Sequence, residues 1–116
     1  MKKILILMTM LFSVSLMQAQ EKKNKNAKVD IEVKGNCDMC KKRIEKAAFK
    51  VKGVKNAEWH QHHQMLHLTI DENKTNPLAI QNAVAKAGHD TKYNEVEVKS
   101  SDENYENLHH CCVYER

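Results

Sequence analysis

Apolar residues at every second position predict half-buried strands, because successive side chains of a strand point to opposite faces. Four segments show this alternation: VDIEVKG (29–35), VKNAEWH (54–60), MLHLTID (65–71) and YNEVEVK (93–99). In the last of them, Val96 and Val98 are expected to face inward. With Trp59 opposite Leu66, the turn between the second and third strands falls at QHHQ, residues 61–64.

Two other segments repeat apolar residues at the spacing of one helix face. The first helix is expected from about Cys40, with Gly53 closing it. The second lies in TNPLAIQNAVAKAG (75–88), where Asn76 is a good N-cap and Gly88 suits the exit. The predicted buried stripes are Ile44, Ala47, Ala48 and Val51 in the first helix and Ile80, Ala83, Val84 and Ala87 in the second.

The order strand, helix, strand, strand, helix, strand over residues 28–99 predicts an α+β, ferredoxin-like βαββαβ sandwich. Two helices would cover one face of a four-stranded antiparallel sheet. In this topology the first two strands run parallel, so three loops share one end of the domain. They are the loop after the first strand, the hairpin turn, and the loop after the second helix, with Cys37, Cys40, His62, His63 and His89.

The ends of the chain differ from this domain. Residues 1–19 have two lysines, an apolar run and a small residue before a possible cut, which predicts a cleaved signal peptide and export to the periplasm. The apolar run is short for a membrane span, so we expect no stable membrane insertion after cleavage. Residues 20–27 are charged and predict a flexible leader, and residues 100–116 form a tail without periodic pattern.

Charge and cysteine content narrow the function. The formal net charge is +4 and falls to +2 without Lys2 and Lys3, which is too mild to indicate a nucleic-acid partner. Four cysteines in an exported chain ordinarily suggest two disulfides. The spacing of the cysteines has to be weighed against that interpretation.

Cys37 and Cys40 form a C-x-x-C pair at the start of the first helix, and three chemistries fit it. The positive end of the helix favours thiolates, and two soft thiolates favour Cu(I) or another soft ion. A lowered cysteine pKa also serves thiol–disulfide exchange. The third alternative is an inert disulfide, which residues at this spacing can form. We favour metal binding, because the only proline, Pro77, is already explained as a helix start and leaves no proline loop opposite the cysteines.

The segment VDIEVKGNCDMCKKRIEKAAFKVKGVKNAEW, followed by LTID and AVAKAGHD, resembles the heavy-metal-associated domain family. The family includes small copper chaperones, domains of copper-transporting ATPases and the periplasmic mercury-binding protein. The resemblance covers residues 28–99 and implies Cys37 and Cys40 as ligands, with transfer of the ion by thiolate exchange. The family loop usually reads Gly-Met-x-Cys-x-x-Cys, whereas here Cys37 follows Gly35 by two residues. Met39 is expected to replace the missing methionine in part, by packing or as a weak thioether.

Histidines and the tail offer further ligands. The resemblance implies that His89, in GHD (88–90), lies close to the ion as a third, weak ligand or a shield. The sequence HHCC adds Cys111 and Cys112 as candidate metal ligands, either together with His109 and His110 or completing a four-ligand site with the first pair. The other alternative is one disulfide with each of Cys37 and Cys40. We expected the last strand to end opposite Cys37, so that the tail has to cross back over about 25 Å. The cluster His60, His62, His63 and His67 would suit a borderline ion, although a solvated hairpin explains it equally.

These observations predict an exported soft-metal-binding protein rather than an enzyme, most simply a Cu(I) chaperone or scavenger. Hg(II) or Zn(II) binding and a thiol–disulfide oxidoreductase are the alternatives. The expected partners are the metal ion and a membrane metal transporter or another metal-binding domain. The basic face of the first helix, with Lys41, Lys42 and Lys46, would guide docking to an acidic partner, or would serve solubility alone.

Overall fold

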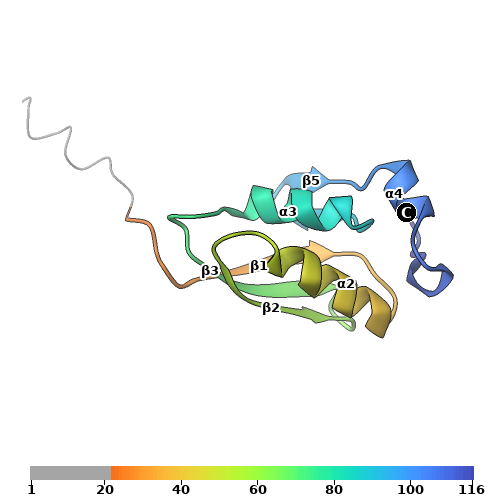
Figure 1. Ribbon diagram of the computed structural model, residues 1–116, viewed down its shortest axis with the longest axis horizontal. Helices are drawn as coiled ribbons and strands as arrows, with labels where there is room; N and C mark the ends of the chain where they lie inside the picture. Colours follow the sequence, from red (N-terminus) through yellow and green to blue (C-terminus); the bar gives the residue numbers. More distant parts are fainter. Residues whose placement is uncertain (1–21) are drawn as a thin grey trace, which may run out of the picture.

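The computed structural model describes residues 22–116, so the predicted signal peptide lies outside the described residues. Its strands are β1 (Ala27–Val33), β2 (Val54–His60), β3 (Met65–Ile70), β4 (Thr91–Tyr93) and β5 (Val96–Val98). Its helices are α2 (Asp38–Phe49), α3 (Pro77–Lys86), α4 (Asp102–Glu106) and the 3₁₀ turn η1 (His110–Cys112). Helices α2 and α3 lie side by side over the sheet, and α4 and η1 gather at the end of the molecule where α2 begins (Figure 1).

The strands form one antiparallel sheet in the order β2-β3-β1-β4-β5. Its first four positions are those of the predicted ferredoxin-like fold, and β5 is an addition at the edge beside β4. Trp59 lies opposite Leu66, so the predicted register of the β2–β3 hairpin is correct. The predicted turn at residues 61–64 is also present, and Gln64 in it takes a positive φ of 53°.

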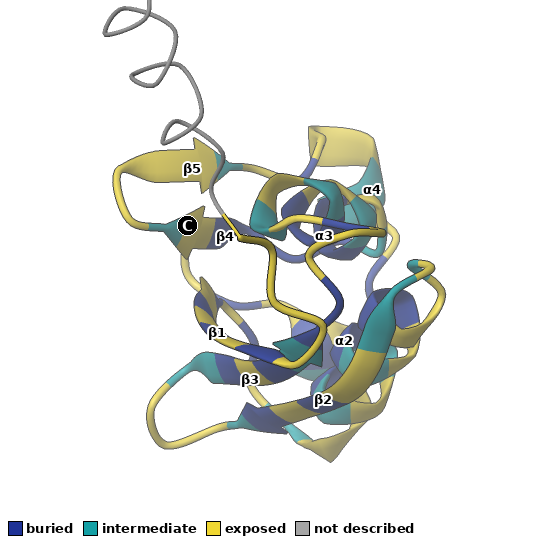
Figure 2. Cartoon of the chain, turned by 90° about the vertical axis from the view of Figure 1, so that its left-hand side faces the viewer, coloured by how far each residue is buried: buried dark blue, intermediate teal, exposed yellow. Residues whose placement is uncertain are grey.

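The fourth predicted strand is wrong in its position and in the direction of its side chains. The strand beside β1 is β4, which pairs Thr91 with Val33, and the chain then reverses at Asn94, with φ 53°, into β5. Asparagine tolerates this left-handed conformation, so it supports a tight turn in the middle of the predicted strand. Val96 is therefore 49% exposed rather than inward, and Figure 2 shows β5 as an exposed edge.

Both predicted helices are present, with one change of boundary and one change in the buried stripe, since α3 buries Gln81 and Ala85 whereas Ala83 and Ala87 are half-buried. Helix α2 starts at Asp38 with Cys37 as its N-cap residue, rather than at Cys40. Gly53 follows the helix with φ 104°, in the conformation that favours glycine. The N-cap prediction for α3 is confirmed, because the Asn76 side chain accepts a hydrogen bond of 2.9 Å from the Ala79 backbone N–H.

The core lies between the sheet and the two helices. Inward residues of β1, β2 and β3 meet the buried residues of α2 and α3, and β1 alternates strictly between buried and exposed positions. Trp59 is 1% exposed, and its indole N–H donates to the Val33 carbonyl at 3.0 Å. This bond joins the end of β1 to β2 directly beneath the loop that carries the first cysteine pair.

The tail, residues 100–116, is folded against the domain. Leu108, Cys112 and Tyr114 are buried in it, and α2 packs against η1. The expectation that the tail starts at the pole opposite Cys37 is wrong: the β4–β5 hairpin sets Val98 beside Thr91, which pairs with Val33 at the cysteine end of β1. Short local elements are therefore enough to bring the tail to the cysteines. None of the helices described in residues 22–116 is long and apolar enough to cross a membrane.

Candidate metal site

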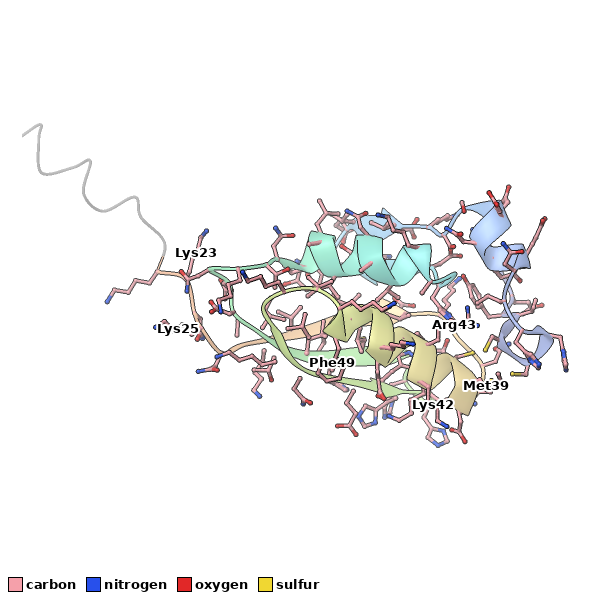
Figure 3. All side chains as sticks on the ribbon, viewed as in Figure 1. Lys23, Lys25, Met39, Lys42, Arg43 and Phe49 are labelled. Carbon is pink, nitrogen blue, oxygen red and sulfur yellow. The ribbon has the colours of Figure 1, made fainter. Side chains whose placement is uncertain are left out.

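The four cysteine sulfurs gather at the end of the domain where β1 leaves the sheet. Cys37 comes from the N-cap of α2 and Cys40 from its first turn, whereas Cys111 and Cys112 come from η1. Figure 3 shows the sulfur atoms between the start of α2, marked by Met39, and the folded tail. All four are free thiols, with Cys40 and Cys112 buried and the other two partly exposed.

The Cys37 sulfur is the centre of this cluster. It lies 3.0 Å from the sulfur of Cys111, 3.6 Å from that of Cys40 and 3.7 Å from that of Cys112. The Cys111 and Cys112 sulfurs are 3.9 Å apart. Within residues 22–116, the ligand atoms of Cys37, Cys111 and Cys112 form the one group of three or more that lies close enough to share a metal ion. A soft cation that prefers thiolates fits this donor set.

The loop that carries Cys37 is held from beneath by other parts of the fold. A Cβ atom on Gly35 would lie 3.1 Å from the Trp59 ring and 3.1 Å from the Cys40 Cβ atom, so glycine permits this close approach. The Gly35 N–H donates to the Gln64 side chain at 2.9 Å, which ties the loop to the hairpin turn. The Asn36 N–H donates to the Cys40 sulfur at 3.4 Å, which ties the loop to the first turn of α2.

The pKa of Cys37 is lowered, whereas those of the two tail cysteines are raised. The hydrogen bond from the Cys111 thiol lowers the pKa of Cys37 to about 7, and contacts with Cys40 and Cys112 act in the same direction. The same bond raises the pKa of Cys111, since its proton is held by the Cys37 sulfur. Burial raises the pKa of Cys112 far above the ordinary thiol value. A bound cation would have to displace the protons of these two thiols.

Met39 does not replace the family methionine by packing under the loop. Its side chain is 47% exposed, because it lies on the outer side of the first turn of α2. The position beneath the loop is filled by Trp59 instead. The Met39 sulfur does approach the cluster, since it accepts a hydrogen bond from the Cys111 thiol at 3.4 Å, and its role as a thioether ligand stays a prediction.

The tail is anchored by contacts that sequence reasoning did not find. The Tyr114 hydroxyl accepts from the Asp90 N–H at 2.8 Å and donates to the Gly88 carbonyl at 2.9 Å. Arg116 pairs with Asp90 at 3.2 Å and donates to the Ser100 carbonyl at 2.7 Å. The one signal in the sequence was the apolar character of the tail, with Tyr105, Leu108, Val113 and Tyr114.

His89 is buried close to this anchor but does not join the sulfur group. Its Nδ1 atom lies 2.7 Å from the Lys34 carbonyl, which makes it a donor, and its ring stacks on Tyr114 at 5.7 Å. Its Nε2 atom is buried without a partner among the described residues. Burial lowers the pKa of His89, so the ring is neutral. The third-ligand prediction is therefore not supported by the geometry, and His89 acts as a support of the loop.

The remaining histidines lie elsewhere. His60 and His67 are on the open face of the sheet with ring centroids 4.9 Å apart, and His67 pairs with Asp30 at 2.6 Å. His62 and His63 are exposed in the hairpin turn. Among the described residues these four do not form a group with ligand distances, so the solvated hairpin explains them.

Comparison with known proteins found similar solved structures. No family model matches the chain, and no curated protein matches it. Oxidized MerP from Ralstonia metallidurans CH34 is 28% identical, with a TM-score of 0.55, over 58% of this chain and 94% of that one. The N-terminal domain of a potential copper-translocating P-type ATPase from Bacillus subtilis, solved in its Cu(I)-loaded state, is 26% identical, with a TM-score of 0.56, over 65% of this chain and 94% of that one. CopZ metallochaperone shares the fold at 22% identity and a TM-score of 0.55, over 57% of this chain and all of that one.

Proposed function

We propose that this chain, a heavy-metal-associated domain with a cysteine-bearing tail, is an exported, periplasmic carrier of a soft metal ion, in first place Cu(I). The observation that carries the proposal is the pair of sulfurs of Cys37 and Cys40, 3.6 Å apart at the start of α2. The lowered pKa of Cys37 supplies one thiolate near neutral pH. The protein would act as a chaperone or scavenger. It would pass the ion on by exchange of one thiolate at a time.

Ligand chemistry supports Cu(I) first. Two thiolates satisfy Cu(I) at low coordination number, and soft thiolates select it over harder ions. The similar structures support a soft ion in general, since one of them is a domain solved in its Cu(I)-loaded state. Hg(II) and Zn(II) are the alternatives to be measured beside it.

A basic groove between α2 and α3 supports a protein partner with acidic groups. Its volume is about 780 Å³, and it opens beside the sulfur cluster at Met39 (Figure 3). The cations that line it are Lys42, Arg43, Lys46, Lys50 and Lys86. Lys41 is not among them; its amine pairs with Glu45 at 3.2 Å and donates to the Trp59 carbonyl at 3.0 Å. Positive charge beside the sulfur cluster would speed the encounter with an acidic metal-binding domain or transporter.

Thiol–disulfide exchange is the second candidate, and a specific observation favours it. Cys37 has a pKa of about 7 and lies 3.0 Å from Cys111, which is the position of a resolving thiol. An exchange enzyme would reduce or oxidise a test disulfide catalytically with these residues. A carrier would bind the ion tightly and turn over no disulfide.

The test is a competition titration of the reduced chain of residues 20–116 under anaerobic conditions, with Cu(I), Zn(II) and Hg(II) against chelators of known affinity. Cys37→Ser is expected to abolish the tight Cu(I) site. His62→Ala, an exposed change at the same end of the molecule, is the matched control and is expected to leave the site intact. Retention of tight Cu(I) binding by Cys37→Ser would contradict the proposal, and catalysed reduction of a disulfide without tight binding would establish the exchange enzyme.

A further inference from the structure

We infer that Cys111 and Cys112 of the tail join Cys37 and Cys40 in a closed four-thiolate site for a tetrahedral divalent d¹⁰ ion, with Zn(II) or Cd(II) as the chemical class. The inference rests on the proposed function only in sharing the first cysteine pair. It gives the carrier two sets of ligands: the Cys37 and Cys40 pair for Cu(I), and a four-sulfur set that retains a divalent ion.

Four of the six sulfur–sulfur distances of such a site are short in this structure, whereas Cys40 lies outside the group of three sulfurs that are all within 4.8 Å of one another, so its sulfur has to approach those of the tail when an ion binds. With metal–sulfur bonds of about 2.3 Å, the sulfurs of a tetrahedral zinc site lie about 3.8 Å apart. Three of the observed distances, 3.6, 3.7 and 3.9 Å, are within a few tenths of an ångström of this edge. The fourth, from Cys37 to Cys111, is 3.0 Å and has to widen, which the partly exposed Cys111 at the rim of the cluster permits.

The tail is built to hold its two sulfurs in this place. Tyr114 and Arg116 anchor it to Asp90 and its neighbours on one side of η1. Leu108 packs on the other side, against Gly88, where a Cβ atom would lie 2.6 Å from the Leu108 side chain. The Asn36 side-chain amide donates to the Val113 carbonyl, which ties the tail to the loop of the first pair. These contacts do not involve the sulfurs, so the cysteines are positioned before an ion arrives.

Charge and burial explain why such a site would retain its ion. Binding of the divalent cation releases the thiol protons to solvent and leaves four thiolates around one dication, with a net charge of −2. The N-terminal end of α2 and the nearby Lys42 and Arg43 of the basic groove oppose this charge. Cys40 and Cys112 are fully buried, so an acceptor cannot reach their sulfurs while the tail is docked.

The test is a Cd(II) titration of the reduced chain of residues 20–116, which contains the whole described fold, followed by sulfur-to-metal charge-transfer absorption. The wild type is expected to show the intensity of four thiolates at one Cd(II) per chain. The double variant Cys111→Ser/Cys112→Ser is expected to lose about half of this intensity, because two sulfurs remain. Val113→Ala, in the exposed part of the same segment, is the matched control and should keep full intensity.

A second readout does not depend on any variant folding. The ¹¹³Cd NMR shift of the wild-type complex reports the number of sulfur ligands directly, and a four-sulfur value is expected. Full charge-transfer intensity in the double variant, or a two-sulfur shift in the wild type, would overturn the inference and leave the Cu(I) proposal standing. The double variant should still bind Cu(I) through Cys37 and Cys40, whereas loss of the proposed function is read separately from Cys37→Ser.

Discussion

At the residue scale, the reactivity of this protein is concentrated in Cys37. Its sulfur lies at the N-cap of α2 and accepts a hydrogen bond from the Cys111 thiol. The buried Cys112 is the opposite case, since burial raises its pKa. Two cysteines of one cluster are therefore set to ionise at different pH.

We expect alkylation by iodoacetamide to distinguish them. The rate at Cys37 should rise through a midpoint near pH 7, because the thiolate is the nucleophile and the pKa is about 7. Cys111→Ala should move this midpoint toward the ordinary thiol value by removing the donor. Peptide mapping by mass spectrometry measures each site, and a midpoint at Cys37 unchanged in Cys111→Ala would show that another cause lowers the pKa.

The buried neutral ring of His89 makes stability depend on pH. Its pKa is lowered from the ordinary value of 6.5, so below that pH the unfolded chain binds a proton that the folded chain does not. The contribution of His89 to the free energy of unfolding is therefore fully present above pH 6.5. It falls as the pH drops below 6.5, by at most about 1.4 kcal/mol per pH unit.

Urea unfolding of the reduced chain at a series of pH values between 7 and 5 measures this slope, and His89→Gln should flatten it. His62→Ala, an exposed histidine, is the control and should retain the wild-type slope. An equal slope in His89→Gln would assign the pH dependence to other groups.

At the scale of elements, the docked tail depends on a few hydrogen bonds at the end of α3. Tyr114 is buried, and its hydroxyl serves both a backbone donor and a backbone acceptor. Its ring also contacts Tyr105 at 5.0 Å. The ring packing and the hydroxyl contribute separately, so they can be tested separately.

Tyr114→Phe should keep the ring and remove the hydroxyl, leaving the Asp90 N–H and the Gly88 carbonyl without a partner. The expected cost is about 1–3 kcal/mol of tail stability. Limited proteolysis should show faster cleavage in residues 100–116 than in the wild type. Tyr93→Phe, in a strand away from the tail, is the control, and an unchanged cleavage rate in Tyr114→Phe would mean that packing alone holds the tail.

The elements show what sequence patterns can predict. The alternation of apolar and polar residues was sufficient to predict β1, β2 and β3, because each of these strands has one face against the core. The pairing of Trp59 with Leu66 followed from the same pattern. It failed at residues 93–99, where an edge hairpin is exposed on both faces and Asn94 turns the chain. The contacts of Tyr114 and Arg116 with Asp90 span 24 and 26 residues, and no local pattern reports such pairs.

At the scale of the whole molecule, the candidate site is made by both ends of the fold together. The C-x-x-C pair could be predicted from its spacing and its helix start, and three loops do meet at one end, as the topology required. The meeting of this pair with Cys111 and Cys112 depends on the β4–β5 hairpin, which was missed. An ion bound between them would join the tail to the domain.

We therefore expect a bound metal ion to stabilise the entire fold. A ligand that binds only the folded state adds about 4 kcal/mol at a free concentration 1,000 times its dissociation constant. Thermal unfolding with and without Cd(II) measures the rise in Tm, and a chelator should reverse it. Cys37→Ser should show a smaller rise, because it removes the central sulfur of the cluster, and a rise as large as that of the wild type would mean that the ion binds away from the sulfur cluster.

The docked 3₁₀ turn η1 carries Cys112 and packs against α2, which carries Cys40, and both of these side chains are fully buried. An ion bound by these sulfurs would leave no faster than η1 undocks, whatever the affinity of the acceptor. Raising the acceptor concentration would speed release only up to a plateau, and the plateau would equal the opening rate of the C-terminal segment. The residence time of the ion would thus be set by the rate of a conformational change rather than by the strength of the metal–sulfur bonds.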